Sequence, residues 1–176
     1  MEEQDFTNFS LRKAELKDLP HIWPIFEQAI AKRREEGSSQ WQDGYPNPNS
    51  IEADIQAGHG YVCLDAGGKL IAYLALIFTG EPAYEALEGQ WLSTLPFAVV
   101  HRVAVRQQPH IKGLASWLMQ GIEPIVLAAG FQSIKVDTNF DNAAMLRILE
   151  KLGYTYCGEV YFRGSARKAF EKLLNK

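Results

Sequence analysis

The sequence predicts a mixed α/β domain with a central twisted, mixed sheet of six or seven strands and helices on both faces. Apolar segments of strand length alternate with helical patterns, and such strand–helix–strand crossovers require a partly parallel sheet. Hairpin signals add antiparallel strands. At 176 residues the chain is expected to form one domain over residues 1–176, large enough to bury a core.

Strands are expected at residues 8–14, in a hairpin over 61–78, and at 97–105, 132–138, 154–162 and 166–174. For the last of these segments, a helix is the alternative. Helices are expected at residues 16–36, 51–58, about 114–129 and 141–153. The two long connections between these elements, residues 38–50 and 79–96, are rich in aromatic side chains.

Local signals place the ends of the helices and strands. The first helix carries apolar residues at helical spacing and ends at Gly37. Ser50 is a candidate cap for the second helix, and Asp141 for the last. Gly67 and Gly68 suit the tight turn of the hairpin.

The strand at residues 97–105 is too apolar for a sheet edge, so we expect it to be central.

Composition limits the classes of function. The hydrophobic content of 47% and charged content of 22% are ordinary for a globular protein, and the net charge of −3 argues against nucleic-acid binding. No apolar run approaches the ~20 residues of a membrane span, and the polar, acidic N-terminus is unlike a secretory signal. Cys63 and Cys157 lack metal-ligand spacing, so we expect reduced thiols, no metal and a cytoplasmic location.

The stretch VAVRQQPHIKGLASWLMQ, residues 103–120, passes from a strand through a polar loop into a helix. A helix N-terminus presents unpaired backbone N–H groups that bind phosphates. Gly113 and Ala115 allow a close approach, and Lys112 and His110 can add side-chain contacts. The alternative is a simple strand-to-helix turn that uses a glycine.

Two blocks of the sequence resemble the GNAT superfamily of acetyl-CoA-dependent N-acetyltransferases. In HRVAVRQQPHIKGLASWLM, residues 110–115 occupy the pyrophosphate signature Arg/Gln-x-x-Gly-x-Gly/Ala. DTNFDNAAMLRILEKLGY is similar to the Asn-x-x-Ala-x-x-x-Tyr-Glu-Lys-x-Gly-Phe block of that superfamily. The residues that match or nearly match this second block are Asn142, Glu150, Lys151, Gly153 and Tyr154.

The resemblance implies transfer of an acetyl group from acetyl-CoA to the primary amine of a small-molecule or peptide acceptor. Direct attack in a ternary complex is favoured over a covalent intermediate, since the sequence offers no well-placed nucleophile. Backbone N–H groups of the central strand would face the thioester oxygen, and Asn142 would approach the pantetheine. The implied strand residues are Arg102, Val103, Ala104 and Val105. The implied pyrophosphate residues are His110, Ile111, Lys112, Gly113, Leu114, Ala115 and Ser116.

The chain departs from the family pattern at three positions. His110 and Ile111 are unusual in the signature, and Leu149 replaces a tyrosine that commonly protonates the leaving thiolate. Another group or water would then supply the proton; the nearby candidates are Tyr154, Tyr156 and Cys157. The alternative function is a catalytically weak or inactive acyl-CoA-binding or interaction protein.

Candidate acid–base residues lie on or near the predicted strands. An acceptor ammonium must lose a proton before it attacks, which requires a base or a water chain. Glu81, after the hairpin, is the sharpest candidate, with a solvated loop acid as the alternative. His101 lies within an apolar strand and Asp137 ends the next one; Asp137 could pair with His101 or with Arg102, and a structural role is open for both.

The aromatic connections suggest an acceptor site. Trp41, Tyr45, Tyr84 and Trp91 could line a cleft that binds a cation or an apolar group. They could equally cover the core or form an oligomer interface, so a homodimer is open. A thiol hydrolase that uses Cys157 is a rival reading, although a nucleophile in the middle of a strand is poorly placed.

Overall fold

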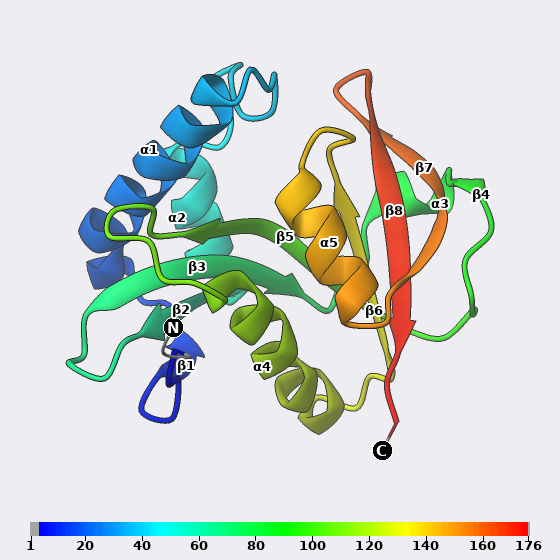
Figure 1. Ribbon diagram of the computed structural model, residues 1–176. Helices are drawn as coiled ribbons and strands as arrows, with labels where there is room; N and C mark the ends of the chain where they lie inside the picture. Colours follow the sequence, from blue (N-terminus) through cyan, green and yellow to red (C-terminus); the bar gives the residue numbers. More distant parts are fainter. Residues whose placement is uncertain (1–3, 176) are drawn as a thin grey trace. The chain divides into compact units, whose positions relative to one another are not determined.

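The structure is a computed structural model that describes residues 4–175. Within these residues eight strands form one sheet in the order β1-β2-β3-β5-β6-β8-β7-β4 (Figure 1). The mixed α/β fold is confirmed, with one strand more than expected and mostly antiparallel pairing. The ends of the predicted domain, residues 1–3 and 176, lie outside the described part.

The chain divides into two compact units. One comprises Met1–Leu76 and Arg102–Leu118, and the other comprises Ile77–His101 and Met119–Lys176. Strand β5 (Ala98–Val105) passes through both units, so that consecutive residues, His101 and Arg102, belong to different ones.

The first unit contains an antiparallel hairpin, as predicted. The hairpin is formed by β2 (Gly60–Leu64) and β3 (Leu70–Ile77). Strand β1 (Ser10–Lys13) pairs antiparallel with the other side of β2. The Asp65 carboxylate accepts hydrogen bonds from the backbone N–H groups of Gly67 and Lys69 in the turn. Gly68 has a φ of +83°, the left-handed conformation that glycine allows at little cost.

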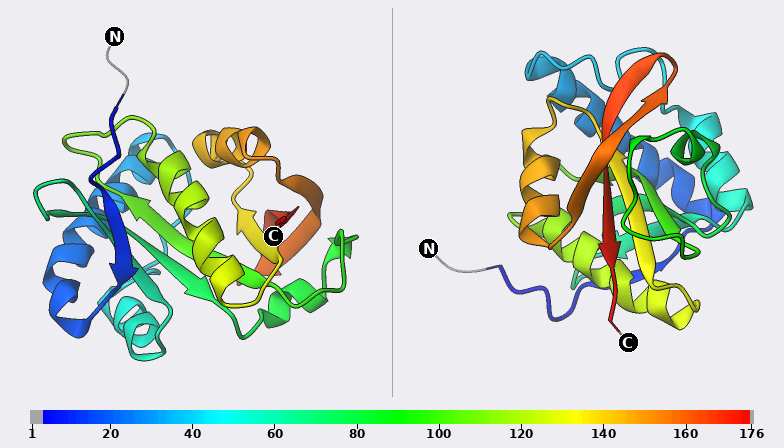
Figure 2. Two further views of the ribbon diagram at one scale, coloured as in Figure 1. Left: turned by 90° about the horizontal axis from the view of Figure 1, so that it is seen from below. Right: turned by 90° about the vertical axis from the view of Figure 1, so that its right-hand side faces the viewer.

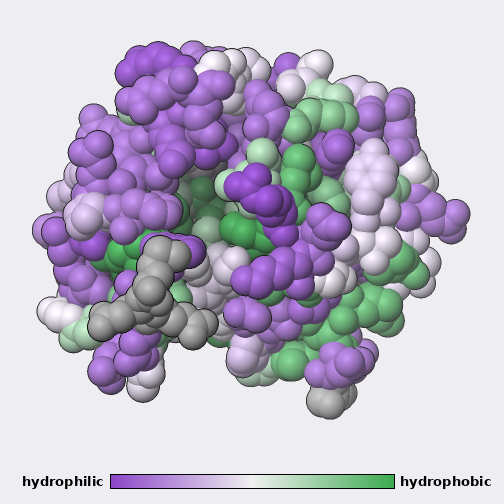
Figure 3. All heavy atoms as spheres, viewed as in Figure 1, coloured by the Kyte–Doolittle hydropathy of each residue, from purple (hydrophilic) through white to green (hydrophobic). Residues whose placement is uncertain are grey.

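The helices of this unit are η1 (Leu16–Asp18), α1 (Leu19–Glu35) and α2 (Pro48–Gln56). Helix α1 buries one side at helical spacing, and its buried residues are Ile22, Ile25, Phe26 and Ala29. The surface of α1 in Figure 3 is mostly hydrophilic, as expected for the opposite side of an amphipathic helix.

Helix α2 is capped by Asn47, so the predicted cap at Ser50 is wrong. The Asn47 side chain accepts a hydrogen bond from the backbone N–H of Ser50, at 2.9 Å. The Ser50 hydroxyl in turn accepts one from the backbone N–H of Asn47, also at 2.9 Å. This reciprocal capping box places Ser50 at the third position of the helix.

The strands of the second unit are β4 (Glu88–Gly89), the first half of β5, β6 (Ser133–Thr138), β7 (Thr155–Phe162) and β8 (Ser165–Leu173). Strands β5 and β6 are parallel from Ala98 to Val100, and β8 pairs antiparallel with both β6 and β7. The last segment is therefore a strand, as favoured, and β5 lies inside the sheet. Strand β4 is the additional strand, which was not predicted from the sequence.

The helices of this unit are α3 (Pro82–Glu85), α5 (Ala143–Lys151) and most of α4 (Leu114–Ala128). Figure 2 shows α3 and α5 on opposite faces of the strands of the second unit. The cap of α5 is Asn142, whose side chain accepts from Met145 N–H, while Asp141 accepts from the Asn139 side chain; the predicted cap at Asp141 is wrong. None of the helices within residues 4–175 is both long and apolar enough to cross a membrane.

Two glycines allow β4 to approach β7 closely. Gly89 and Gly158 are paired across these strands and have φ values of +150° and +142°. A Cβ atom on Gly158 would overlap the carbonyl oxygen of Glu88, and one on Gly89 would overlap that of Cys157. Because both obstacles are backbone atoms, no rotation of a side chain can relieve them.

We therefore expect Gly158→Ala to lower the free energy of unfolding by about 3 kcal/mol or more, through overlap and backbone strain together. Gly164→Ala is the matched control, since Gly164 has a φ of +76° but open space around its missing Cβ. This control substitution should lower the free energy of unfolding by only about 1–2 kcal/mol. Urea denaturation of both variants measures the difference, and equal losses would contradict the assigned β4–β7 contact.

Candidate active site

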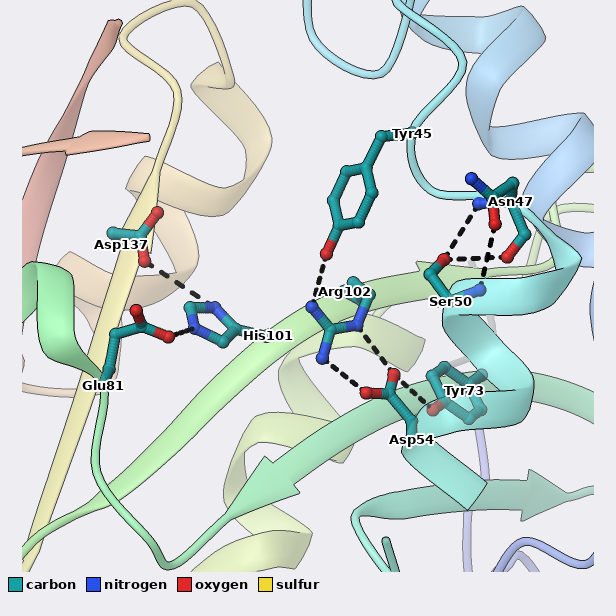
Figure 4. A network of polar contacts seen from close by, with 9 residues as sticks. All are labelled: Tyr45, Asn47, Ser50, Asp54, Tyr73, Glu81, His101, Arg102 and Asp137. Atoms are coloured by element: carbon teal, nitrogen blue, oxygen red, sulfur yellow. Dashed lines mark hydrogen bonds and ion pairs between the residues drawn. The ribbon is translucent and has the colours of Figure 1, made fainter. Parts of the chain in front are cut away.

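His101 in the second unit lies between two carboxylates (Figure 4). Its Nε2 is 3.0 Å from Glu81 Oε2, and its Nδ1 is 3.7 Å from Asp137 Oδ1. The side chain of His101 is 13% exposed. The structure thus brings together three of the predicted acid–base residues, and Asp137 lies beside His101 and not beside Arg102. An imidazole placed this way can receive a proton at one ring nitrogen and release one at the other.

Glu81 is held by the start of α3. It occupies the N-cap position, and its Oε1 accepts a hydrogen bond from the backbone N–H of Ala83. Pro82 at the first helical position suits this geometry, because its fixed φ is that of a helix. The other carboxylate oxygen, Oε2, is the atom that faces His101.

Asp137 is the buried member of the cluster. The Tyr84 hydroxyl donates a hydrogen bond to its Oδ1 at 2.5 Å, and Arg167 lies 3.9 Å from its other oxygen. Burial raises the pKa of Asp137 above its usual value, although His101, Tyr84 and Arg167 act in the opposite direction. Sequence reasoning missed the contribution of Tyr84, because nothing local connects it with a residue 53 positions away.

Tyr84 and Trp91, predicted to bind the acceptor, pack around this cluster. The Tyr84 ring is buried, and it contacts Trp91, Phe97, His101 and Phe162. The Trp91 indole N–H donates to the Tyr84 carbonyl at 3.0 Å. Their role in acceptor binding stays a prediction, and their observed contacts are those of residues that support His101 and Asp137.

A buried carboxylate, Glu171, fixes the segment of the chain that follows α3. Glu171, on β8, is fully buried. It accepts hydrogen bonds from the Leu92 N–H and from the hydroxyls of Ser93 and Ser133. The ammonium group of Lys135 lies over the rings of Trp91 and Phe97, at 4.2 and 3.8 Å from their centroids, and burial lowers its pKa. These contacts anchor the connection predicted at residues 79–96, and no sequence motif indicated them.

Arg102 belongs to a separate network in the first unit (Figure 4). Its guanidinium binds both oxygens of Asp54, at 2.6 and 2.7 Å, and donates to the Tyr45 hydroxyl at 2.6 Å. Tyr73 donates a further hydrogen bond to Asp54. Arg102 has a φ of +53°, which is unusual for a residue other than glycine.

Tyr45 is therefore a partner of Arg102, while Trp41, the other predicted acceptor residue of this unit, packs on Phe26 with ring centroids 5.6 Å apart. The predicted role of both in acceptor binding stays open. Beyond Arg102, the β5 residues implied in coenzyme binding are Val103 and Val105, which are half-buried, and Ala104, which is buried.

The loop before α4, predicted to bind a phosphate, turns at a left-handed glycine. Gly113 has a φ of +81° and is exposed, and a Cβ there would meet only the Phe6 ring, at 3.8 Å. Leu114 N–H donates to the Ile111 carbonyl at 3.3 Å and Trp117 N–H to the Gly113 carbonyl at 2.9 Å, so the N–H groups of Ala115 and Ser116 are those of the first turn that could face a ligand. His110 and Lys112 are exposed, Ile111, Ala115 and Ser116 are half-buried, and Leu114 is buried.

The second motif block supplies core residues and a cap. Leu149 is fully buried, and Asn142 uses its side-chain oxygen to cap α5. Of the candidate proton donors, Tyr156 is exposed, whereas Tyr154 is buried, and its hydroxyl has no hydrogen-bond partner among residues 4–175. Burial raises the pKa of Tyr154. Cys157 is also buried, burial raises its pKa, and its thiol donates to the Thr155 carbonyl. These features disfavour the thiolate that a thiol hydrolase would need as its nucleophile.

The profile of the acetyltransferase (GNAT) family matches residues 22–154. The chain belongs to the GNAT acetyltransferase family. It is thus an acetyltransferase, and members of this family use acetyl-CoA to acetylate amines. The resemblance seen in the two sequence blocks is confirmed, and the predicted transferase activity with it.

Two kinds of relatives extend this assignment. The L-methionine sulfoximine/L-methionine sulfone acetyltransferases of Pseudomonas aeruginosa and Pseudomonas paraeruginosa are 26% identical over 156 residues, covering 86% of this chain and 83% of theirs. The crystal structure of a GNAT acetyltransferase from Streptococcus agalactiae is 35% identical, covers 99% of this chain and all of its own, and has a TM-score of 0.88. The yncA protein of Salmonella typhimurium, solved with its cofactor acetyl-CoA, shares the fold at 16% identity, with a TM-score of 0.68 and 97% and 96% coverage.

The Asp54–Arg102 contact should be sensitive to the loss of either partner. We expect Asp54→Asn to lower the free energy of unfolding by about 3–5 kcal/mol, because it leaves a largely buried guanidinium without its counter-charge. The double variant Asp54→Asn/Arg102→Gln should lose less free energy of unfolding than the two single variants lose together. Denaturant unfolding of the three variants, with Glu52→Gln on α2 as control, tests this; strict additivity would contradict the coupling.

Proposed function

We propose that the protein is an N-acetyltransferase that transfers the acetyl group of acetyl-CoA to the primary amine of a small acceptor by direct attack in a ternary complex. The observation that carries the proposal is the Glu81–His101–Asp137 cluster, in a chain of the GNAT family. A small acceptor is favoured over a peptide because the named relatives acetylate free amino-acid analogues.

Proton transfer is the step for which this cluster is suited. The acceptor enters as an ammonium, and we assign its proton to the Glu81 carboxylate, either directly or through one water. His101 positions that carboxylate through the 3.0 Å contact, and Asp137 holds the other side of the imidazole. The amine nitrogen then forms its bond to the acetyl carbon as the carbon–sulfur bond breaks. The nitrogen releases its second proton to water, and coenzyme A leaves as the thiol once its sulfur has taken up a proton.

The coenzyme is proposed to lie on β5 and on the start of α4. Acetyl-CoA supplies the acetyl group as a reactive thioester. We assign its pyrophosphate to the turn at residues 110–116, where a left-handed glycine and the first N–H groups of α4 would accommodate a phosphate. Backbone N–H groups of residues 102–105 would face the thioester oxygen, and the free amide nitrogen of Asn142 would face the pantetheine.

Two of the three candidate donors for the leaving sulfur are disfavoured by burial, whereas the third, Tyr156, is exposed. Leu149 is fully buried and cannot donate, and burial raises the pKa of both Tyr154 and Cys157. We therefore assign this proton to water or to the exposed Tyr156 hydroxyl. The same observation favours a second candidate function, a coenzyme-binding protein with weak or no catalysis. A homodimer and a cytoplasmic location stay predictions.

The first test is calorimetric titration with acetyl-CoA, for which we expect micromolar affinity. Gly113→Glu should abolish binding, because its side chain would fill the turn and repel the phosphates. Gly68→Glu is the matched control, since Gly68 has a similar φ of +83° in an open hairpin turn. Unchanged affinity in a folded Gly113→Glu variant would contradict the phosphate assignment.

The second test measures release of the coenzyme thiol with a panel of amines that includes L-methionine sulfoximine and L-methionine sulfone. With an accepted amine, Glu81→Gln should lower kcat by about 10²–10⁴-fold, because the amide cannot take a proton but can still accept from Ala83 N–H. Glu85→Gln, on the exposed side of α3, should behave as wild type. Tight acetyl-CoA binding without turnover of any amine would instead support the non-catalytic candidate.

A further inference from the structure

The loop that leads to the proposed phosphate turn is held by a side chain from another element. Gln28, on α1, directs its Oε1 at two consecutive backbone N–H groups, those of Gln107 at 2.9 Å and Gln108 at 3.3 Å. Helix α1 and this loop both belong to the first unit, and 79 residues separate Gln28 from Gln107. One amide oxygen thus satisfies two adjacent donors of an irregular segment.

Elsewhere the loop is held at its start and by contacts among its own residues, which include an antiparallel bridge between Gln107 and His110. Its start is fixed by Arg106 N–H, which donates to the Ile71 carbonyl on β3. Within the loop, the Gln107 side chain donates to the Val105 carbonyl and the Arg106 side chain to the Pro109 carbonyl. Residues 108–110, 112 and 113 are exposed, and the next buried side chain is Leu114 at the start of α4.

These contacts explain how the turn can be ordered before a ligand arrives. A phosphate at residues 110–116 would be bound mostly by backbone N–H groups, so the affinity depends on where the backbone lies. Without the Gln28 oxygen, water would take the backbone N–H groups of residues 107 and 108, and the loop would be less ordered in the free protein. The coenzyme would then have to order the loop when it binds, which would lower its affinity. Gln28 removes part of that cost, because α1 is packed into the core through Phe26 and Ala29 beside it.

We propose that Gln28 is a positioning residue for coenzyme binding, which acts by fixing residues 107 and 108 and hence the phosphate turn. This inference rests on the proposed placement of the acetyl-CoA pyrophosphate. Gln28 would not touch the coenzyme, and it would not affect the chemistry at Glu81.

Gln28→Met tests the inference, since methionine keeps the length and helix preference of the side chain but lacks the acceptor. We expect the backbone amides of Gln107 and Gln108 to exchange hydrogen faster in the free protein. Acetyl-CoA should bind about tenfold more weakly, the loss expected for two modest hydrogen bonds. With an accepted amine, KM for acetyl-CoA should rise while kcat stays unchanged.

Two further variants separate positioning from a general effect on folding. Gln28→Glu keeps an acceptor oxygen and should restore slow exchange at residues 107 and 108. Glu27→Met, at the exposed neighbouring position, should leave exchange and affinity as in wild type.

Wild-type affinity in Gln28→Met would overturn the inference, as would exchange that accelerates throughout the first unit. Failure of the wild-type protein to bind acetyl-CoA would overturn the proposed function itself, so the two failures can be told apart.

Discussion

The main constraint on the first unit is the buried pair between Arg102 and Asp54. Arg102 adopts a left-handed backbone conformation in the middle of β5, which costs about 1–2 kcal/mol for a residue with a side chain. Two hydrogen bonds to Asp54 and one to Tyr45 offset that cost and define the path of the strand. Strain of this kind persists where surrounding contacts determine the conformation, and it is common at functional sites.

In the second unit, the same strand presents His101 to two carboxylates that the chain holds by different means. Glu81 is fixed because it caps a helix, and Asp137 is fixed by the Tyr84 hydroxyl within a buried aromatic cluster. The half-buried Glu81 and the buried Asp137 therefore differ in environment, and burial raises the pKa of Asp137. Such a division suits Glu81 to exchange protons with an acceptor and Asp137 to hold the imidazole.

The proposed coenzyme site has a different physical basis. Here the backbone and the helix terminus supply the donors, and side chains serve to place them. Gly113 permits the left-handed turn, and Gln28 holds the loop that precedes it. The unusual His110 and Ile111 are then tolerable, because neither side chain is required for the backbone to bind a phosphate.

The sequence by itself determined the elements and the family. Periodicity, turn glycines and two motif blocks placed most strands and helices, the hairpin at Gly68 and the turn at Gly113, because these signals lie within a few residues of one another. The caps were misplaced because Asn47 and Asn142 compete with equally suitable neighbours. The short elements β4 and α3 were missed because two to four residues carry no period.

Only the tertiary structure decided which polar groups meet. Arg102 lies 48 residues from Asp54, His101 lies 20 from Glu81, and Gln28 lies 79 from Gln107. Such pairs depend on strand register and on which helix packs against which strand, and each sequence segment is compatible with several partners. The sequence could therefore name Glu81, His101 and Asp137 as candidates, but their shared contact, and the supporting roles of Tyr84, Asp54 and Gln28, follow from packing.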